Sequence, residues 1–437
     1  MSELLNIWRP MQEAALKAVD SGDAVGRGLQ GESDVLESTK GSVYLLAVGK
    51  AAAAMSLAAE GYLGDRLEAG LAVTKHGHGL PGLERVRLME AGHPQPDQAG
   101  LEASEQVIAF LGDHLGPQDL LLLLLSGGGS ALLPAPVEGV SLQDKARAID
   151  LLMAQGADIH ELNALRKHLS RLKGGRLLDH CAGCRVLALL VSDVVGDDPS
   201  SIASGPAAAD PTSFQDCLRI LEEHEVEARM PASVMEVLKA GAQGGRGETP
   251  KPGDPRFKRV RTRIIADNRR ALLAAADVAR AQGFRPLVLS STLEGDTAEA
   301  ARFHASMARE VLQAGLPLPA PCCLLSGGET TVRVSGEGKG GRNQEFALWC
   351  ARYSRQFERE VLFVSLGTDG GDGPTDAAGA WSLPSTCQRA AGLGLECRDF
   401  LRRNDSYHFF EPLGQLLKTG PTHTNVMDVR AVLIPSG

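Results

Sequence analysis

A run of six leucines, Leu120–Leu125, limits the fold of this chain more than any other segment. Six consecutive apolar side chains cannot alternate between core and solvent, so a strand made of them must be buried on both faces. The run is far shorter than the roughly 20 apolar residues that a membrane-spanning helix needs. We therefore expect it to form a central strand of a parallel sheet that helices cover on both faces.

Strand and helix patterns alternate along most of the 437 residues. Short apolar runs predict strands at 44–48, 71–73, 120–125, 186–191, 262–266, 286–290, 322–325, 331–335, 361–366 and 431–435. Amphipathic or alanine-rich stretches predict helices at 4–20, 50–61, 97–112, 141–155, 158–179, 213–224, 231–240, 268–282, 296–315 and 342–354. This alternation is typical of an α/β fold with parallel sheets and helices on both faces.

The chain is too long for one ordinary hydrophobic core, so we expect two α/β domains. Residues 241–257 hold eight Gly or Pro in seventeen positions, which makes them the best candidate for a linker. The predicted domains are therefore residues 1–245 and 258–437. Two alternatives stay open, namely that 241–257 is a long surface loop and that the N-terminal helix packs elsewhere.

Composition excludes several classes of protein. A net charge of −9 and an aromatic content of 4% argue against a nucleic-acid partner. The N-terminal segment lacks the apolar stretch of a targeting signal, so we expect a cytoplasmic protein with no membrane partner. Cys181 and Cys184 form a C-x-x-C pair without the second pair that a zinc site needs, and we expect all eight cysteines to be ordinary thiols. The sequence is compatible with a homo-oligomer but does not fix the oligomeric state.

Ligand-binding residues in α/β sheets follow the carboxyl ends of strands. Lys50 comes directly after the strand 44–48 and opens a helix, where a cation and free backbone N–H groups suit a phosphate or carboxylate. A plain surface lysine is the alternative. The six leucines are followed by Ser126, Gly127, Gly128, Gly129 and Ser130. Because glycines let a backbone approach a ligand closely, we expect this loop to cradle an anion rather than to be a flexible turn.

Two further segments of the first half carry candidate side chains. Residues 163–176 hold six basic side chains, which form either a solvated helix face or a binding face that includes Asn163 and Arg166. Asp193 is the first carboxylate after the strand 186–191 and is a candidate base or Mg²⁺ ligand. The following Asp197 and Asp198 have turn formation as their alternative role.

The second half contains two glycine-rich segments. Gly336, Gly338 and Gly341 fit the dinucleotide fingerprint G-x-G-x-x-G, but the preceding strand 331–335 alternates polar and apolar residues, unlike a buried Rossmann strand. We favour a mobile cationic phosphate loop formed by Gly338, Lys339, Gly340, Gly341 and Arg342. The strand 361–366 is followed by a loop with Asp369, Asp372 and Asp376, which we expect to bind metal or hydroxyl groups rather than to form a plain turn.

Neither a Walker A sequence nor the protein-kinase elements H-R-D and D-F-G are present. Taken together, however, the motifs of this sequence resemble the class of glycerate 2-kinases whose C-terminal part is the MOFRL domain. The matching segments span nearly the whole chain and are AVGKAAAAM (47–55), GHPQPD (92–97), LLSGGGSALL (124–133), NALRKHLSRLKGGRL (163–177), SDVVGDD (192–198), IASGP (202–206), LSGGETTV (325–332), GEGKGGRNQEFAL (336–348) and SLGTDGGDGPTDAAGA (365–380).

The resemblance implies ATP-dependent phosphorylation of D-glycerate to 2-phospho-D-glycerate, with Mg²⁺. It implies an N-terminal Rossmann-like doubly wound sheet, a C-terminal MOFRL α/β domain and an active site in the cleft between them. Lys50 and Arg342 match the family's essential cations, and Asp193 and Asp369 match its carboxylates, one as base and one as metal ligand in an order left open. Two rivals remain, an NAD(P)H-dependent hydroxypyruvate reductase and a non-catalytic metabolite-binding protein.

Overall fold

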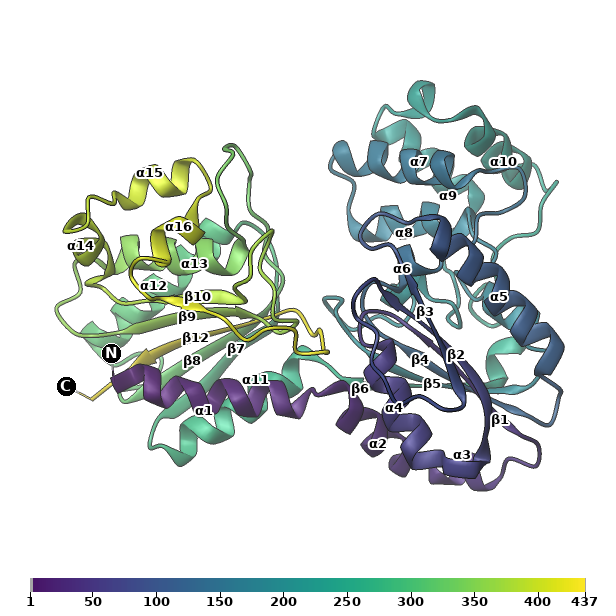
Figure 1. Ribbon diagram of the computed structural model, residues 1–437. Helices are drawn as coiled ribbons and strands as arrows, with labels where there is room; N and C mark the ends of the chain where they lie inside the picture. Colours follow the sequence, from purple (N-terminus) through teal and green to yellow (C-terminus); the bar gives the residue numbers. More distant parts are fainter. Residues whose placement is uncertain (1–2, 437) are drawn as a thin grey trace. The chain divides into compact units, whose positions relative to one another are not determined.

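The structure, a computed structural model, describes residues 3–436 and divides into two compact units. The N-terminal unit comprises residues 21–265, and the C-terminal unit comprises residues 3–20 together with 266–436. Each unit contains its own sheet of six strands with helices packed against it (Figure 1). Two α/β units were predicted, and this part of the fold class is confirmed.

The sheet of the N-terminal unit has the strand order β3-β2-β1-β4-β5-β6. The pairs β3–β2, β2–β1, β1–β4 and β4–β5 are all parallel. Its strands are β1 (Val43–Val48), β2 (Leu67–Lys75), β3 (Val86–Ala91), β4 (Leu120–Leu125), β5 (Arg185–Val191) and β6 (Val260–Ala266). This is the strand order of a doubly wound nucleotide-binding sheet, in which ligands bind where the order reverses, between β1 and β4.

Burial of β4 on both faces explains why its sequence is uninterrupted leucine. Leu121, Leu123 and Leu125 share one core with helix α5, whereas α2 packs on the opposite face, where a Cβ added to Gly28 would lie 3.2 Å from Leu189 of β5. The helices around this sheet are α2 (Ser21–Gly31), α3 (Ser33–Glu37), α4 (Ala52–Leu63), α5 (Gln98–His114) and α6 (Gly129–Leu132). The predicted Rossmann-like, doubly wound sheet is thus confirmed.

Four further helices form a small helical group with a core of its own (Figure 1). They are α7 (Leu142–Ala154), α8 (Ile159–His168), α9 (Phe214–Glu223) and α10 (Ala232–Ala242). The predicted helix 158–179 was too long, because α8 ends at His168 and the chain then runs irregularly through Lys173. Short 3₁₀ turns follow at Arg176–His180 and Ile202–Ser204.

The sheet of the C-terminal unit has the order β11-β10-β9-β12-β8-β7 and is mixed. Strands β7 and β8 are parallel, but β12 lies between β8 and β9 and is antiparallel to both. Its strands are β7 (Arg285–Leu293), β8 (Cys322–Gly328), β9 (Leu362–Gly367), β10 (Gly379–Ser382), β11 (Leu416–Leu417) and β12 (Asp428–Ile434). The expectation of a parallel sheet was therefore wrong for this unit, because the last strand of the chain inserts at its centre.

Helices cover both faces of this second sheet. Helices α12 and α13 share a core with β8, β9 and β12. Helix α11 packs against β7 and β8, and α1 packs against α11. The helices are α1 (Glu3–Ala18), α11 (Asn268–Ala281), α12 (Thr297–Ala314), α13 (Arg342–Ser354), α14 (Thr386–Ala391), α15 (Cys397–Arg402) and α16 (Ser406–Phe410). The predicted strand 331–335 is absent, because after an isolated bridge at Thr331 this segment is irregular.

The division between the units differs from the predicted one at 245/258. Strand β6 was assigned to the second domain, yet it joins the N-terminal sheet beside β5, so the division falls after Ile265. The Gly/Pro-rich segment 241–257 is accordingly a loop inside the N-terminal unit. Helix α1 belongs to the C-terminal unit, where the carbonyl of Ile7 accepts a hydrogen bond from Gln282 Nε2 at 3.3 Å.

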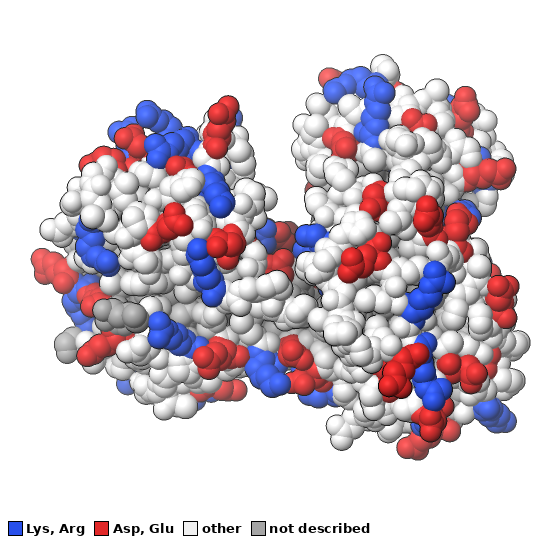
Figure 2. Space-filling model, viewed as in Figure 1, with Lys and Arg blue, Asp and Glu red and all other residues white. Residues whose placement is uncertain are grey.

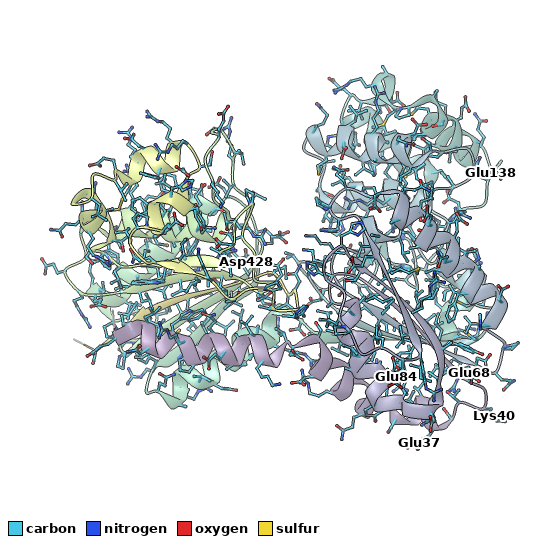
Figure 3. The ribbon with its side chains drawn as sticks, viewed as in Figure 1. Glu37, Lys40, Glu68, Glu84, Glu138 and Asp428 are labelled. Atoms are coloured by element: carbon cyan, nitrogen blue, oxygen red, sulfur yellow. A yellow bond between two sulfur atoms is a disulfide. The ribbon has the colours of Figure 1, made fainter. Side chains whose placement is uncertain are left out.

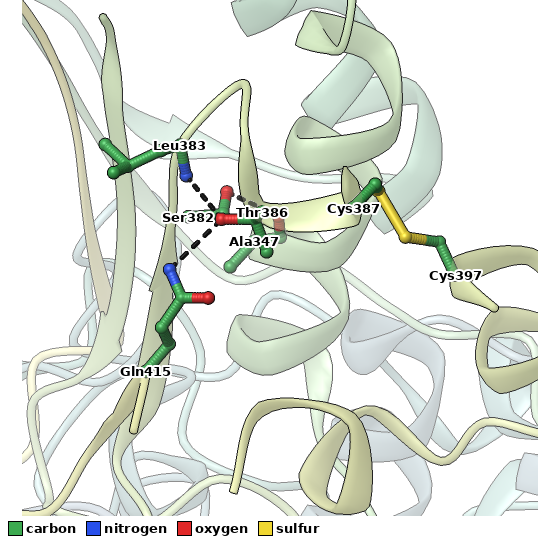
Figure 4. The surroundings of a disulfide bond; sticks show 7 residues. All are labelled: Ala347, Ser382, Leu383, Thr386, Cys387, Cys397 and Gln415. Atoms are coloured by element: carbon green, nitrogen blue, oxygen red, sulfur yellow. Dashed lines mark hydrogen bonds between the residues drawn. A yellow bond between two sulfur atoms is a disulfide. The ribbon is translucent and has the colours of Figure 1, made fainter. Parts of the chain in front are cut away.

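Cysteine pairing also departs from the prediction. Cys387 of α14 and Cys397 of α15 form a disulfide (Figure 4), so these two residues are not the ordinary thiols that were expected. The pair closes a turn beside Thr386, whose hydroxyl accepts hydrogen bonds from the Leu383 backbone N–H at 2.9 Å and from Gln415 at 3.1 Å. Cys181 and Cys184 are free and buried, as are Cys217, Cys322, Cys323 and Cys350.

The described residues include no helix that combines the length and apolar character needed to cross a bilayer. On the face seen in Figure 2, basic and acidic side chains are interspersed over both units. Several exposed charges lie near the amino ends of the first sheet's strands, among them Lys40 just before β1 and Glu68 in β2 (Figure 3). The candidate site residues lie at the opposite, carboxyl ends.

We expect Leu324→Ala to destabilise the C-terminal unit by about 2–5 kcal/mol, because Leu324 lies fully buried in β8 and its loss leaves a cavity. Leu273→Ala is the matched control, since that α11 side chain is 50% exposed, and its cost should stay within about 0.5 kcal/mol. All three tryptophans, Trp8, Trp349 and Trp381, belong to this unit, so denaturation followed by tryptophan fluorescence reports on it. Equal costs for the two leucines would contradict the packing.

Candidate active site

Backbone hydrogen bonds join the two loops at the switch point of the N-terminal sheet. The loop after β1 donates from Lys50 N to the Gly127 carbonyl at 2.8 Å and from Ala51 N to Ser126 Oγ at 3.1 Å. Gly49 has a φ of +136°, and a Cβ there would lie 2.1 Å from Ser126 Oγ, so this close approach requires glycine. The structure thus brings Lys50 and the Ser126–Ser130 loop together, and their binding of an anion remains a prediction.

His93 is a neighbour of this site that the sequence reasoning did not single out. Gly128 has a φ of +88°, and a Cβ at this position would lie 2.9 Å from His93 Cδ2 and 3.3 Å from Lys50 Cγ. The imidazole and the lysine stem therefore flank the glycine loop from two strands, β3 and β1. The only sequence signal for His93 was the G-H-P-Q-P-D motif, whose place in the fold no local pattern reveals.

A chain of side-chain hydrogen bonds continues from the glycine loop to α8. Ser130 and Ser204 share a hydrogen bond of 2.6 Å, Ser204 donates to Asn163 Oδ1 at 3.0 Å, and Arg166 donates to the same oxygen at 3.3 Å. Asn163 Nδ2 is buried and has no hydrogen-bond partner among the described residues. The predicted pair Asn163 and Arg166 thus adjoins the loop, whereas Ser204 was missed.

The basic segment 163–176 is not a solvated face. Lys167, His168 and Lys173 are buried, and the buried ammonium of Lys173 donates to the Leu133 carbonyl at 2.8 Å. Lys145, also buried, donates to the carbonyls of Pro134 and Leu169. Burial, together with the nearby charge of Arg166, lowers the pKa of Lys173 to about 7. The solvated-face alternative was therefore wrong.

Positive charge dominates this part of the unit. Between residues 3 and 436, no carboxylate forms an ion pair with Lys145, Arg166 or Lys173, although Lys167 pairs with the buried Asp210 at 3.4 Å. Burial lowers the pKa of Arg166 because no nearby anion offsets the lost hydration. The half-buried Arg166 guanidinium, without a carboxylate partner, lies beside the unpartnered Nδ2 of Asn163, and this pair of donors suits an anionic ligand.

Asp193 and Asp198, which both follow β5, lie in different surroundings. Asp193 lies two residues beyond the end of β5 and is half-buried. Asp198 instead forms a turn, because its carboxylate accepts hydrogen bonds from the backbone N–H of Ser200 and from the hydroxyls of Ser200 and Ser201. These contacts hold the pKa of Asp198 below its usual value although burial alone would raise it. The turn role that was kept open for Asp198 is confirmed.

In the C-terminal unit, Arg342 opens α13 at the carboxyl ends of β8 and β9. Its Nε and Nη2 donate to the two oxygens of Asp428 at 2.8 and 3.0 Å, and Nη1 lies 2.9 Å from Glu329. Asp428, labelled in Figure 3, is fully buried at the start of β12, where it pairs with Gly328 and Gly367. Burial lowers the pKa of Arg342, but the charges of Asp428 and Glu329 raise it by more.

The three carboxylates of the loop after β9 have separate roles. Asp372 is buried and caps α13 by accepting from the backbone N–H groups of Asn343 at 3.0 Å and Gln344 at 2.8 Å. Burial raises the pKa of Asp372 to about 6, with a smaller contribution from Asp428. Asp376 is exposed and binds Lys418 and Tyr407. Asp369 is half-buried and accepts a hydrogen bond from the Gly371 backbone N–H at 3.0 Å.

Packing accounts for the glycines of the 336–341 segment. A Cβ at Gly336 or Gly338 would lie 2.4 Å from backbone atoms of Arg403, and one at Gly341 would lie 2.3 Å from Asp372. Lys339 stacks its ammonium 4.2 Å from the centre of the Tyr407 ring. The dinucleotide interpretation requires a strand directly before the glycines. Residues 332–335 are irregular, so the structure does not support this interpretation. A phosphate-binding role for Gly338–Gly341 remains a prediction.

Asp428, which binds Arg342, also contacts a cluster of buried polar side chains. Arg430 donates from Nη2 to Asp428 at 2.8 Å and to the Thr330 hydroxyl at 3.0 Å, while its Nε and Nη1 have no partner among the described residues. His304 lies 2.7 Å from both the Ala300 carbonyl and the Ser326 hydroxyl. Since a carbonyl only accepts, Nδ1 carries the proton and Nε2 accepts from Ser326. Burial lowers the pKa of His304 to about 4, so the ring is neutral at pH 7.

The carboxylates of the described residues do not form a metal site made of protein ligands alone. Across residues 3–436, no group of three or more His, Cys, Asp or Glu side chains is arranged to hold a metal ion. Asp193 belongs to the N-terminal unit and Asp369 to the C-terminal unit. Each unit thus offers one half-buried carboxylate, and Mg²⁺ is usually bound by one or two carboxylates together with water and substrate phosphates.

Two protein families match this chain. The family described as a domain of unknown function, DUF4147, matches residues 8–239, and the MOFRL family matches residues 322–428. A glycerate 2-kinase from Pyrococcus horikoshii is 39% identical over 429 residues, which cover 97% of this chain and 95% of that protein. The chain belongs to the glycerate 2-kinase family with a MOFRL domain.

A solved structure and a second relative extend this comparison. The crystal structure of a glycerate kinase from Thermotoga maritima superimposes with a TM-score of 0.86 at 38% identity and covers 99% of both chains. A relative from Agrobacterium vitis, 40% identical over 98% of this chain and 94% of its own length, carries the provisional name hydroxypyruvate reductase. The resemblance predicted from the sequence motifs is confirmed.

We expect Gly128→Ala to cost about 1–3 kcal/mol more in stability than Gly156→Ala. Both glycines have a similar positive φ, +88° and +84°, so the two variants share the penalty of the left-handed conformation. Only Gly128 has neighbours that a methyl group would strike, since nothing lies within 4 Å of a Cβ at Gly156. Calorimetric unfolding measures the difference, and equal costs would mean that His93 and Lys50 do not confine the loop.

We expect His304 to make the C-terminal unit less stable in acid. Its pKa of about 4 lies below the unfolded value of 6.5, so its contribution is complete above pH 6.5 and is lost as the pH falls through 4. The loss amounts to about 3 kcal/mol. In His304→Asn this part of the pH dependence should disappear, whereas His160→Asn, at an exposed position, should keep it. Denaturation followed by tryptophan fluorescence between pH 4 and 7 tests this, and an unchanged slope in His304→Asn would contradict it.

Proposed function

We propose that this protein transfers the γ-phosphoryl group of ATP to D-glycerate and forms 2-phospho-D-glycerate. The observation that carries the proposal is similarity over the full length to proteins named glycerate kinase, at 39% identity in Pyrococcus horikoshii and 38% in Thermotoga maritima. The cations Lys50 and Arg342 and the glycine loop after β4 support the proposal, because such a reaction needs positive charge and backbone N–H groups beside phosphate. Phosphoryl transfer depends mainly on positioning and charge stabilisation.

In the proposed reaction, the 2-hydroxyl oxygen of glycerate attacks the γ-phosphorus. One P–O bond forms, the P–O bond to ADP breaks, and the hydroxyl proton passes to a carboxylate, for which Asp193 and Asp369 are the candidates. We assign to Lys50 and Arg342 the neutralisation of the glycerate carboxylate and of the phosphoryl group in transfer. The Ser126–Ser130 loop offers backbone N–H groups to phosphate, and Asn163 and Arg166 offer donors to substrate.

Magnesium enters this proposal as part of the nucleotide substrate. When bound, Mg²⁺ neutralises charge on the phosphates of ATP, and either Asp193 or Asp369 would serve as a protein ligand.

The reductase alternative is supported by the provisional name of the Agrobacterium vitis relative. A dinucleotide fold carries its G-x-G-x-x-G fingerprint in the turn after the first strand. In this chain that turn is Gly49-Lys50 followed by four alanines, so the fingerprint is missing where the fold requires it. The kinase is therefore the better-supported function.

The compartment is also part of the proposal. The six buried free thiols suit a reducing environment and hence the cytoplasm. The Cys387–Cys397 disulfide argues in the opposite direction, and the six thiols outweigh this single pair.

One coupled assay distinguishes the candidate functions. With ATP, Mg²⁺ and D-glycerate, we expect ADP release that depends on glycerate, and NMR of the product should show phosphate on the 2-hydroxyl. Oxidation of NADH or NADPH with hydroxypyruvate, without glycerate-dependent ADP release, would overturn the kinase. Binding without any turnover would leave a metabolite-binding protein.

We expect Lys50→Ala and Arg342→Ala each to lower kcat at least about 100-fold, because each removes a charge that stabilises the transition state. Lys40→Ala is a matched control, since the exposed Lys40 lies just before β1 (Figure 3), whereas Lys50 lies just after that strand in the sequence. Arg280→Ala, on the exposed surface of α11, is the control for Arg342. Near-normal turnover in both site variants would exclude the assigned roles.

A further inference from the structure

Two carboxylates of different character hold the guanidinium of Arg342. Asp428 takes the Nε and Nη2 edge with two hydrogen bonds of 2.8 and 3.0 Å, the bidentate geometry that best fixes a guanidinium plane. Glu329 meets the other edge through Nη1 at 2.9 Å. The Asp428 side chain is fully buried, whereas the Glu329 side chain is 44% exposed. One carboxylate is thus built into the core, and the other reaches the same arginine from the surface.

The structure fixes the Asp428 carboxylate from several directions. Its Oδ1 accepts from Asn343 Nδ2 at 2.8 Å, and its Oδ2 accepts from Arg430 Nη2 at 2.8 Å. Its own backbone carbonyl accepts from Asn268 Nδ2 at 2.8 Å. Each oxygen therefore has a second donor besides Arg342, so the carboxylate cannot rotate without breaking buried hydrogen bonds. The plane of the Arg342 guanidinium is set by a rigid partner.

The ion pair between Glu329 and Arg342 is exposed, unlike the buried pair between Asp428 and Arg342. An exposed ion pair gains little from its Coulomb attraction, because solvent screens it and two side chains lose freedom. An incoming oxyanion can replace Glu329 at Nη1 while the Asp428 edge stays bound.

We propose that Asp428 is a positioning residue that fixes the Nη1 edge of Arg342 for the substrate, and that Glu329 occupies this edge until an oxyanion of the substrate displaces it. This inference rests on the proposed function. The oxyanion is either the glycerate carboxylate or a phosphate oxygen, which present the same hydrogen-bond acceptors to a guanidinium.

The matched pair Glu329→Gln and Asp428→Asn tests the proposal, because each change neutralises one carboxylate beside the same arginine. Glu329→Gln should lower KM for one substrate about 3-fold or more, since it removes a competing anion. Asp428→Asn should lower kcat about 100-fold, as expected when a transition-state donor loses its orientation. If both variants change the same parameter in the same direction, the division of roles is wrong. Glu299→Gln, which neutralises an exposed glutamate beside Arg302 on α12, is the control.

Chemical rescue separates positioning from a merely structural role. In Arg342→Ala the space beside Asp428 should accept a free guanidinium ion, and we expect added guanidinium to restore ADP release at least about 10-fold. In the double variant Arg342→Ala with Asp428→Asn this rescue should fail. Tryptophan fluorescence establishes that each variant is folded, and equal rescue in both backgrounds would overturn the role of Asp428.

Calorimetric titration provides a readout independent of turnover. Inorganic phosphate and D-glycerate are titrated separately into wild type and Glu329→Gln, and the ligand that binds more tightly to the variant identifies the displacing oxyanion. If wild type shows no glycerate-dependent ADP release but Glu329→Gln still strengthens anion binding, the proposed function fails and the displacement stands. If wild type is active and neither ligand binds more tightly to the variant, the displacement is wrong.

Discussion

Where a buried strand ends, its last backbone N–H and C=O groups still need hydrogen-bond partners. The candidate site depends on which groups provide these hydrogen bonds. At the end of β4, Ser126 N donates to the Val48 carbonyl at 3.0 Å, and the Gly127 carbonyl accepts from Lys50 N. These bonds tie the loops after β1 and β4 to each other. The position of the Lys50 charge beside the glycine loop therefore follows from the burial of two neighbouring strands.

The C-terminal unit solves the same problem with side chains. Asp372 satisfies the first free N–H groups of α13, and Asp428 joins α13 to the start of β12 through Arg342 and Asn343. Burying these acids is costly unless donors surround them. Asp428 therefore both holds the start of α13 through Asn343 and fixes one edge of the Arg342 guanidinium.

Local patterns predicted the elements well, and they also predicted the residues that lie directly after a strand. The uniform apolar run at Leu120–Leu125 and the polar opening of α13 at Arg342 are both features of consecutive residues. Sequence could not predict contacts between distant segments. Asp428 lies 86 positions from Arg342, and Ser204 lies 74 from Ser130. The sequence also did not predict the burial of Lys145 and Lys173. Their hydrogen-bond acceptors are backbone carbonyls, which every residue has, so no side-chain pattern indicates them.

The path of the chain has a consequence for its synthesis. Helix α1 precedes the N-terminal unit in the sequence, yet its partner α11 begins only at Asn268, after the whole of that unit. Strand β12, which lies between β8 and β9, follows both of them in the sequence. The N-terminal unit can therefore fold during translation, whereas helix α1 must wait for α11 and the C-terminal sheet must wait for β12 before they can pack.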